Sequence, residues 1–255
     1  MASKKYSLLT GVLCLLASYG FSQVTYDVMD SSVVRSKDMD QYTKFKQGID
    51  NYPAKPRNQW ELGIKTGLFN IFGDVPAQTF TAPNVGLHVR KAFGYLFSAR
   101  LEYVHGVGKG LAWQSSQGYR GKGGNPWNDK GYTGPVFYNY KTNVNDLSLE
   151  GIFSLNNIRF HKSKTGVNFY ALAGVGGAIY EAKVNAQNGT TNYNFSTITT
   201  AQTWKNRKDI KDALKKMMDD SYESDAENHG DRRPKLFGQT FKPVAHFGAG
   251  VAFKL

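Results

Sequence analysis

The sequence predicts an all-β protein, an antiparallel transmembrane β-barrel of the small eight-strand type, of which six strands can be recognised, with one helix in a long extracellular loop. Six segments alternate apolar and polar residues with the period of two that is typical of a half-buried strand. The connections between them alternate in length, as in bacterial outer-membrane barrels. After the first 22 residues no apolar run approaches the roughly 20 residues of a spanning helix, so a chain that crosses lipid must do so as a closed barrel.

The N-terminal segment 1–22 is predicted to be a signal peptide. Lys4 and Lys5 precede an apolar run at 8–17, and small and polar residues follow it. This order is typical of export, and we expect cleavage near Ser22. The alternative is a buried N-terminal helix.

The only cysteine, Cys14, lies inside this apolar run. Its removal with the signal leaves a chain without thiols, which excludes disulfides, a thiol nucleophile and a cysteine zinc site. A lipid anchor on Cys14 is the alternative, but Leu13 stands where a small residue is expected.

The charge balance points to anionic partners. The formal charge of +12 becomes +10 (12 − 2) without Lys4 and Lys5. A basic chain can bind nucleic acid, but an exported one meets lipid headgroups and surface polysaccharide instead. We therefore expect outer-membrane lipid, including lipopolysaccharide, as a partner and no nucleic acid.

Residues 23–57 are polar and carry Pro53 and Pro56 near their end. We interpret this segment as a periplasmic leader, with a short helix near 40–49. The barrel then occupies 58–255. Its first three predicted strands are 59–69, 84–91 and 95–105, and lengths near 10 residues suit a tilted strand that crosses a bilayer.

The remaining predicted strands are 137–155, 167–184 and 241–253. In the first of these, Tyr138 and Tyr140 stand on the even parity, whereas Leu147 and Leu149 stand on the odd parity, so we predict a β-bulge near 143–145. The second is rich in glycine and alanine, and we expect Tyr170, Leu172 and Tyr180 to face outwards.

Loop lengths set the topology. The connections 93–94 and 156–166 are short or moderate, whereas 106–135 and 186–240 are long. Because outer-membrane barrels have short periplasmic turns and long extracellular loops, we place the N-terminus in the periplasm of a bacterial outer membrane. Such barrels have an even number of strands, at least eight. Either two strands lie unrecognised in the long loops, or the barrel is incomplete at its C-terminal end; the abrupt end at Leu255 favours the second.

The polar face of the strands is unusually charged. The residues expected to point into the barrel and form a charge network are Glu61, Lys65, His88, Arg90, Arg100, Glu102, Glu150 and His246. The interior of a small barrel is filled by side chains, so these groups must pair with one another. The favoured interpretation is that the network holds the barrel shut, and the alternative is a gated ion path.

Aromatic residues lie near the strand ends. Those expected at the membrane interfaces are Trp60, Tyr95, Tyr103, Tyr170 and Tyr180. Core packing in a soluble sandwich is the alternative, although it would not require them near the ends.

The segments 60–67, 156–160 and 169–176, together with the signal and the polar leader, resemble OmpA-like outer-membrane proteins in the form common in Bacteroidota. The resemblance covers about 58–255 and implies the N-terminal β-barrel domain of that family. It also implies two more strands and a periplasmic peptidoglycan-binding domain, neither of which lies in these 255 residues. Peptidoglycan is therefore an expected partner only of a longer chain.

One loop segment, 206–220, predicts an amphipathic helix. Ile210, Leu214, Met217 and Met218 share one face, and Asn206 could cap the N-terminus. The helix could fold over the barrel mouth or offer a surface to a partner protein, phage or host molecule; the first interpretation is favoured.

The sequence carries no strong catalytic, phosphate-binding or calcium-binding motif, and its histidines lack metal spacing. We therefore expect no enzyme activity, cofactor or metal, but a structural and interaction protein that contributes to envelope integrity. The alternatives are a barrel enzyme that acts on lipid or peptide, with His105 as its candidate residue, and a small pore. The oligomeric state stays open.

Overall fold

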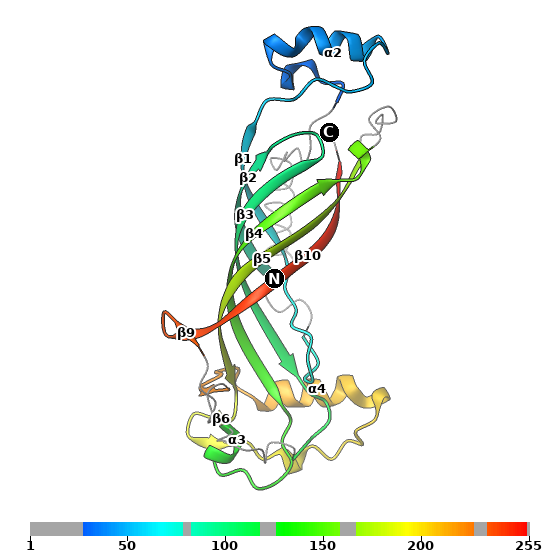
Figure 1. The fold of residues 1–255 in the computed structure, drawn as a ribbon. Coiled ribbons are helices and arrows are strands. Elements are labelled where there is room, and N and C mark those ends of the chain that lie inside the picture. The colour runs from blue at the N-terminus through cyan, green and yellow to red at the C-terminus, as the bar shows by residue number, and fades with distance from the viewer. Residues whose placement is uncertain (1–27, 79–82, 118–125, 159–166, 227–233, 254–255) are drawn as a thin grey trace, which may run out of the picture.

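A computed structural model describes residues 28–78, 83–117, 126–158, 167–226 and 234–253. Its main feature is a strongly curled antiparallel sheet of six long strands (Figure 1). The strands are β1 (Gln59–Leu68), β2 (Pro83–Ala92), β3 (Phe97–Leu111), β4 (Asn139–Ser154), β5 (Val167–Val184) and β10 (Gln239–Phe253). The predicted antiparallel β fold is thus confirmed. In the described part of the chain no ladder joins β1 to β10, so the sheet is an open half-barrel.

Shorter elements occupy the connections. The short strands are β6 (Gln187–Asn188), β7 (Thr191–Asn192), β8 (Ser224–Asp225) and β9 (Lys235–Leu236). The α-helices are α2 (Met39–Lys46), α3 (Pro126–Asp129) and α4 (Arg207–Met217), and the 3-10 turns are Ser31–Val33, Ser36–Asp38, Asn156–Ile158, Phe195–Thr197 and Trp204–Asn206. None of the helices within the described ranges has the length and apolarity needed to cross a membrane.

The two faces of the sheet differ sharply, because successive strand residues point to opposite sides. On the convex face Leu62 is 79% exposed and Phe247 is 83% exposed, whereas on the concave face Glu102 is 2% exposed and Glu150 is 3% exposed. Large apolar side chains therefore cover the outside of the curl, and charged side chains lie inside it.

The β-bulge predicted near 143–145 is wrong. Both ladders of β4 run through Asn143, Val144 and Asn145 without a missing or extra residue. The parity of the apolar residues changes because the concave surroundings change along the strand. Tyr140 packs over Gly110 on this face and donates a hydrogen bond to the Ile71 carbonyl at 3.0 Å.

The outward orientation expected for Tyr170, Leu172 and Tyr180 is also wrong. A Cβ added at Gly250 would meet the Tyr170 ring, and one added at Gly248 would lie 3.2 Å from Leu172, so these side chains share the face of His246. Tyr180 has the same parity. The exposed residues of β5 are on the other parity and include Phe169 and Val175. A strand rich in glycine and alanine has too little contrast between its faces to reveal this from sequence.

The leader contains a small folded lobe at the end of the sheet where β1 begins (Figure 1). Its core consists of Val28, Val33, Val34, Tyr42, Ala54 and Tyr95. Tyr95 comes from the β2–β3 turn, so it is buried in this lobe rather than placed at a lipid interface. The predicted signal peptide lies outside the described residues.

The long connections form a second lobe, the cap, at the opposite end of the sheet (Figure 1). Its core consists of Leu111, Trp127, Val136, Phe137, Val184, Ala186, Tyr193, Phe195, Ile210 and Leu214. Strand β3 continues to Leu111, so part of the predicted loop 106–135 is strand. The predicted amphipathic helix is present as α4, but Asn206 makes no side-chain capping bond and donates instead to the Ala201 carbonyl.

Candidate functional site

A single row of paired positions crosses the concave face of all six long strands. Glu61 pairs with Arg90, Arg90 with Arg100, and Arg100 with Glu150; the row then continues through Gly174 to His246. Residues directly paired in a sheet point to the same face. Strand pairing therefore brings together charged side chains that are up to 100 residues apart, as in Asp146 and His246 (246 − 146). We call the interacting side chains on this face the charged belt: Glu61, Lys65, His88, Arg90, Arg100, Glu102, Asp146, Ser148, Glu150 and His246.

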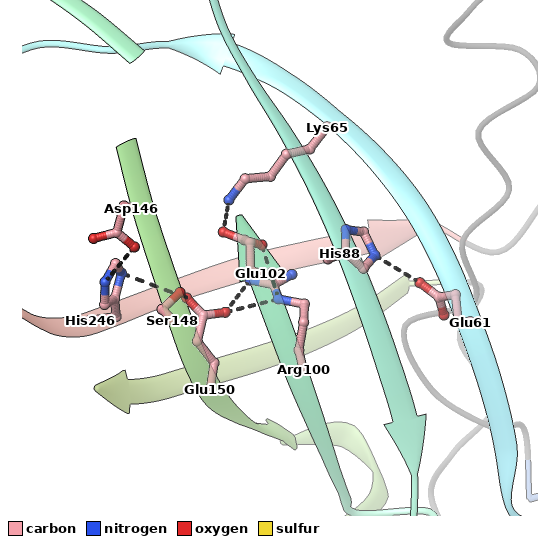
Figure 2. A network of polar contacts seen from close by, with 9 residues as sticks. All are labelled: Glu61, Lys65, His88, Arg100, Glu102, Asp146, Ser148, Glu150 and His246. Atoms are coloured by element: carbon pink, nitrogen blue, oxygen red, sulfur yellow. Dashed lines mark hydrogen bonds and ion pairs between the residues drawn. The ribbon is translucent and has the colours of Figure 1, made fainter. Parts of the chain in front are cut away.

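The first part of the belt joins β1 to β2 and β3. Glu61 pairs with Arg90, and its other oxygen lies 3.2 Å from His88 Nε2. Lys65 reaches Glu102 on β3. Figure 2 shows His88 directed towards Glu61, and Lys65 directed towards Glu102.

Arg100 is the centre of the belt. Its Nη2 lies 2.6 Å from Glu150, and its Nε donates to the same carboxylate at 2.8 Å. The Nε also lies 3.1 Å from Glu102. Glu102 and Glu150 expose only 2% and 3% of their side chains, so each buried carboxylate depends on a nearby cation to offset the cost of its burial.

The belt ends on β10. His246 Nε2 lies 3.1 Å from Asp146, and its Nδ1 lies 3.7 Å from Glu150 (Figure 2). Ser148 adds a hydroxyl 3.5 Å from Glu150. Asp146 and Ser148 were not among the residues predicted for the network, although their even parity on β4 matches that of Glu150. All eight predicted network residues do lie on this face.

Glycines leave room for the long side chains of the belt. A Cβ at Gly86 would lie 2.9 Å from Lys65, and one at Gly174 would lie 2.7 Å from Glu150. At Gly63 a Cβ would collide with the His88 ring. The pattern of glycines beside charged residues therefore has a steric cause.

The five predicted interfacial aromatics fall into three places. Trp60 is 69% exposed on the convex face, where Lys91 lies 4.9 Å from its ring centroid, and Tyr103 is 42% exposed on the same face. Tyr95 is in the N-terminal lobe, and Tyr170 and Tyr180 are on the concave face. Of the five, Trp60 and Tyr103 are therefore the two on the exposed convex face, and their place at a membrane interface stays a prediction.

A polar cluster borders the apolar convex face. The Tyr103 hydroxyl donates to Asn145 Oδ1 at 2.8 Å, and His105 Nδ1 lies 2.9 Å from the same oxygen. His105, the candidate residue of the enzyme alternative, is therefore part of this convex cluster and not of the belt. No group of three or more histidine, cysteine or acidic side chains that could hold a metal occurs in the described residues.

The cap contains its own polar cluster around the buried side chains of Asn185 and Tyr193, which sequence patterns did not indicate. Burial alone would raise the pKa of Asp219, but hydrogen bonds from Ser221, Tyr193 and Asn185 lower it to about 2. Burial raises the pKa of Tyr193 to about 12. These bonds fasten the segment after α4 to the end of β5.

Comparisons with protein-family models, with curated proteins and with solved structures find no match.

Proposed function

We propose that this chain is an OmpA-like outer-membrane β-barrel protein with a structural and interaction role in the bacterial envelope. In this arrangement the N-terminal lobe lies in the periplasm, and the cap faces the outside of the cell. The observation that carries the proposal is the apolar convex face of the curled sheet.

This face is too apolar to suit water. Its exposed large side chains include Leu62, Ile64, Leu87, Leu101, Leu147, Leu149, Phe169, Val175 and Phe247. A soluble monomer rarely exposes a contiguous apolar patch larger than a few hundred Å², whereas a membrane barrel requires one around its circumference.

The dimensions of the face fit a bilayer. The apolar convex residues run from Leu147 on β4 to Leu155 directly after it, and on β5 they run from Phe169 to Ile179. About 10 residues at ~3.3 Å each, tilted by ~45°, rise about 23 Å, close to the apolar band of about 25 Å in outer-membrane barrels. The cluster of Tyr103, His105 and Asn145 marks one border of this band.

The pairing of charges in the belt favours a structural role for it rather than a role as an ion path. Its charges point at one another across the concave face and are mostly buried, so they join neighbouring strands instead of lining an open passage. We therefore expect the chain to show no conductance in planar bilayers.

Substitution of Leu149 by arginine tests the membrane location. Leu149 is 58% exposed on the convex face. In water this exposed site tolerates arginine, whereas at the middle of a bilayer arginine costs about 2–4 kcal/mol. We expect Leu149→Arg to lower the free energy of unfolding by that amount in phospholipid vesicles, measured by urea titration of heat-modifiable migration.

Asn143→Arg is the matched control, because Asn143 lies on the same face of the same strand but beyond the border of the band. We expect it to change stability by less than about 0.5 kcal/mol. Equal stability of the two variants in vesicles, or a wild-type chain that stays monomeric in water without detergent, contradicts the proposal.

A further inference from the structure

Helix α4 carries a row of cations beside its buried face. Ile210 and Leu214 are buried in the cap core. Beside them, Arg207, Lys211 and Lys215 recur at intervals of four residues and so form one row along the helix. Lys208 lies next to this row, about 20° from Lys215 at ~100° per residue.

The cations of this row repel one another. Burial lowers the pKa of Lys211, and the charges of Lys215 and then Arg207 lower it further. Asp209 lies on the opposite side of the helix, about 160° from Lys211 at ~100° per residue, whereas Asp212 stands four residues after Lys208, at the spacing of a favourable pair. A row of like charges at this spacing destabilises an isolated helix, and an anion bound along it would remove that cost.

An exposed tryptophan stands at the start of the row. The Arg207 guanidinium lies 4.1 Å from the centroid of the Trp204 ring, and its Nη1 donates to the Trp204 carbonyl at 2.8 Å. Trp204 is 68% exposed, and Trp113 packs edge-on to it at 6.2 Å. The stacked guanidinium is thus held in one orientation while the indole remains accessible.

The segment before Trp204 is braced against the β3 side of the cap. The Ser115 backbone amide donates to Gln202 Oε1 at 2.8 Å, and Gln202 Nε2 donates to the Ser115 hydroxyl at 2.9 Å. These bonds hold Trp204 in place at the start of the row of cations. We call the surface that the tryptophan and the cations form the ledge: Trp204, Arg207, Lys208, Lys211 and Lys215.

We infer that the ledge binds a phosphorylated saccharide, namely the sugar phosphates of the lipopolysaccharide headgroup. Arginine and lysine recognise phosphate oxygens, and an exposed indole offers an apolar face to the carbon–hydrogen side of a sugar ring. The inference rests on the proposed function, because that function places the cap beside the headgroups of the outer leaflet.

The direct test is a titration of the full chain in detergent with delipidated, phosphorylated lipopolysaccharide core oligosaccharide, followed by tryptophan fluorescence and calorimetry. We expect saturable binding that weakens with added salt, and at least ~10-fold weaker binding of the dephosphorylated oligosaccharide. Inorganic phosphate alone separates simple anion binding from saccharide recognition: if it binds as tightly as the oligosaccharide, saccharide recognition is overturned.

Two double variants with the same loss of charge separate the ledge from general attraction. We expect Lys211→Gln/Lys215→Gln to weaken binding by about 10-fold, and Lys205→Gln/Lys216→Gln, on the same segment but outside the ledge, by less than about 3-fold. Trp204→Ala should weaken saccharide binding without changing its dependence on salt. Equal losses of affinity in the two double variants would overturn the assignment of the binding site to the ledge.

The outcomes also separate this inference from the proposed function. If the wild-type chain inserts into vesicles and binds no oligosaccharide, the ledge is overturned and the membrane barrel remains. If the chain fails to insert, the membrane barrel is overturned whatever the oligosaccharide titration gives.

Discussion

At the residue scale, Glu102 illustrates how the belt stabilises the sheet. Its carboxylate is 2% exposed and contacts both Lys65 on β1 and Arg100 on its own strand. Strand β2 lies between β1 and β3, and Gly86 on β2 leaves room for the Lys65 side chain to pass over it. One carboxylate therefore connects strands that do not pair with each other.

Loss of this carboxylate charge should destabilise the sheet. We expect Glu102→Gln to lower the free energy of unfolding by about 3 kcal/mol, the lower end of the cost of breaking a buried pair, because Arg100 retains Glu150. The measurement is urea unfolding in detergent micelles. Asp40→Asn is the control, since Asp40 and Lys44 form an exposed, solvent-screened pair whose loss should change stability little. Similar effects of the two substitutions would contradict a stabilising belt.

Asp219 gives the cap a dependence on acid. Its pKa is lowered from the ordinary value of an aspartate to about 2, because Ser221, Tyr193 and Asn185 donate hydrogen bonds to the carboxylate despite the opposing effect of burial. A depressed pKa stabilises the fold above the unfolded value, and this contribution is lost as pH falls from about 4 to about 2. We expect the Asp219→Asn variant to lose this contribution to the acid unfolding of the cap. Near-ultraviolet circular dichroism during an acid titration measures it. An unchanged transition would be the contrary result.

At the element scale, the glycines of β5 set how closely it approaches β4. A Cβ at Gly174 would lie 2.5 Å from the Leu149 carbonyl, and one at Gly176 would lie 2.6 Å from the Leu147 carbonyl. These neighbours are backbone atoms of a paired strand and cannot move aside alone. The glycines are therefore needed for the curl at this ladder.

Gly174→Ala should consequently destabilise the sheet by about 1–3 kcal/mol, the range for overpacking a tight contact. Gly94→Ala is the matched control, because a Cβ at Gly94 meets nothing within 4 Å. Thermal loss of heat-modifiable migration measures both. Equal transition temperatures for the two variants would show that the ladder can adjust.

The difference in composition between β1 and β5 explains for which strands the sequence could predict the two faces. Strand β1 has both of its charged residues, Glu61 and Lys65, on one parity, so alternation alone reveals its two faces. Strand β5 has glycine and alanine on both parities, so its faces depend on contacts with Glu150 and β10 that only the fold supplies. Asp146 was missed for a related reason, since its partner His246 is distant in the chain.

At the scale of the whole molecule, two small lobes stand at opposite ends of the curled sheet (Figure 1). Their cores combine residues from turns and loops, such as Tyr95 in the N-terminal lobe and Phe195 in the cap. Loop sequences carry no period that reveals such packing. The sequence therefore predicts a polar leader and long loops, but not the two cores that they form.

The proposed topology predicts unequal access to protease. We expect trypsin added to intact cells to cleave the cap within 205–216 and to spare Lys37 and Lys44 of the N-terminal lobe, because a membrane would separate the two lobes. After permeabilisation both lobes become sites of cleavage. The products can be identified by mass spectrometry, and cleavage at Lys44 in intact cells would reverse the orientation.

The charge row across the sheet also bears on how the strands find their partners. A slip of one residue exchanges the two faces and is opposed by the apolar pattern, but a slip of two residues keeps every side chain on its own face. If β3 slid by two residues along β4, Arg100 would stand opposite Ser148 or Ile152 in place of Glu150. A register shifted by two residues therefore loses ion pairs of the belt even though it keeps the apolar face. The belt thus favours the native register of the strands where the apolar pattern alone does not.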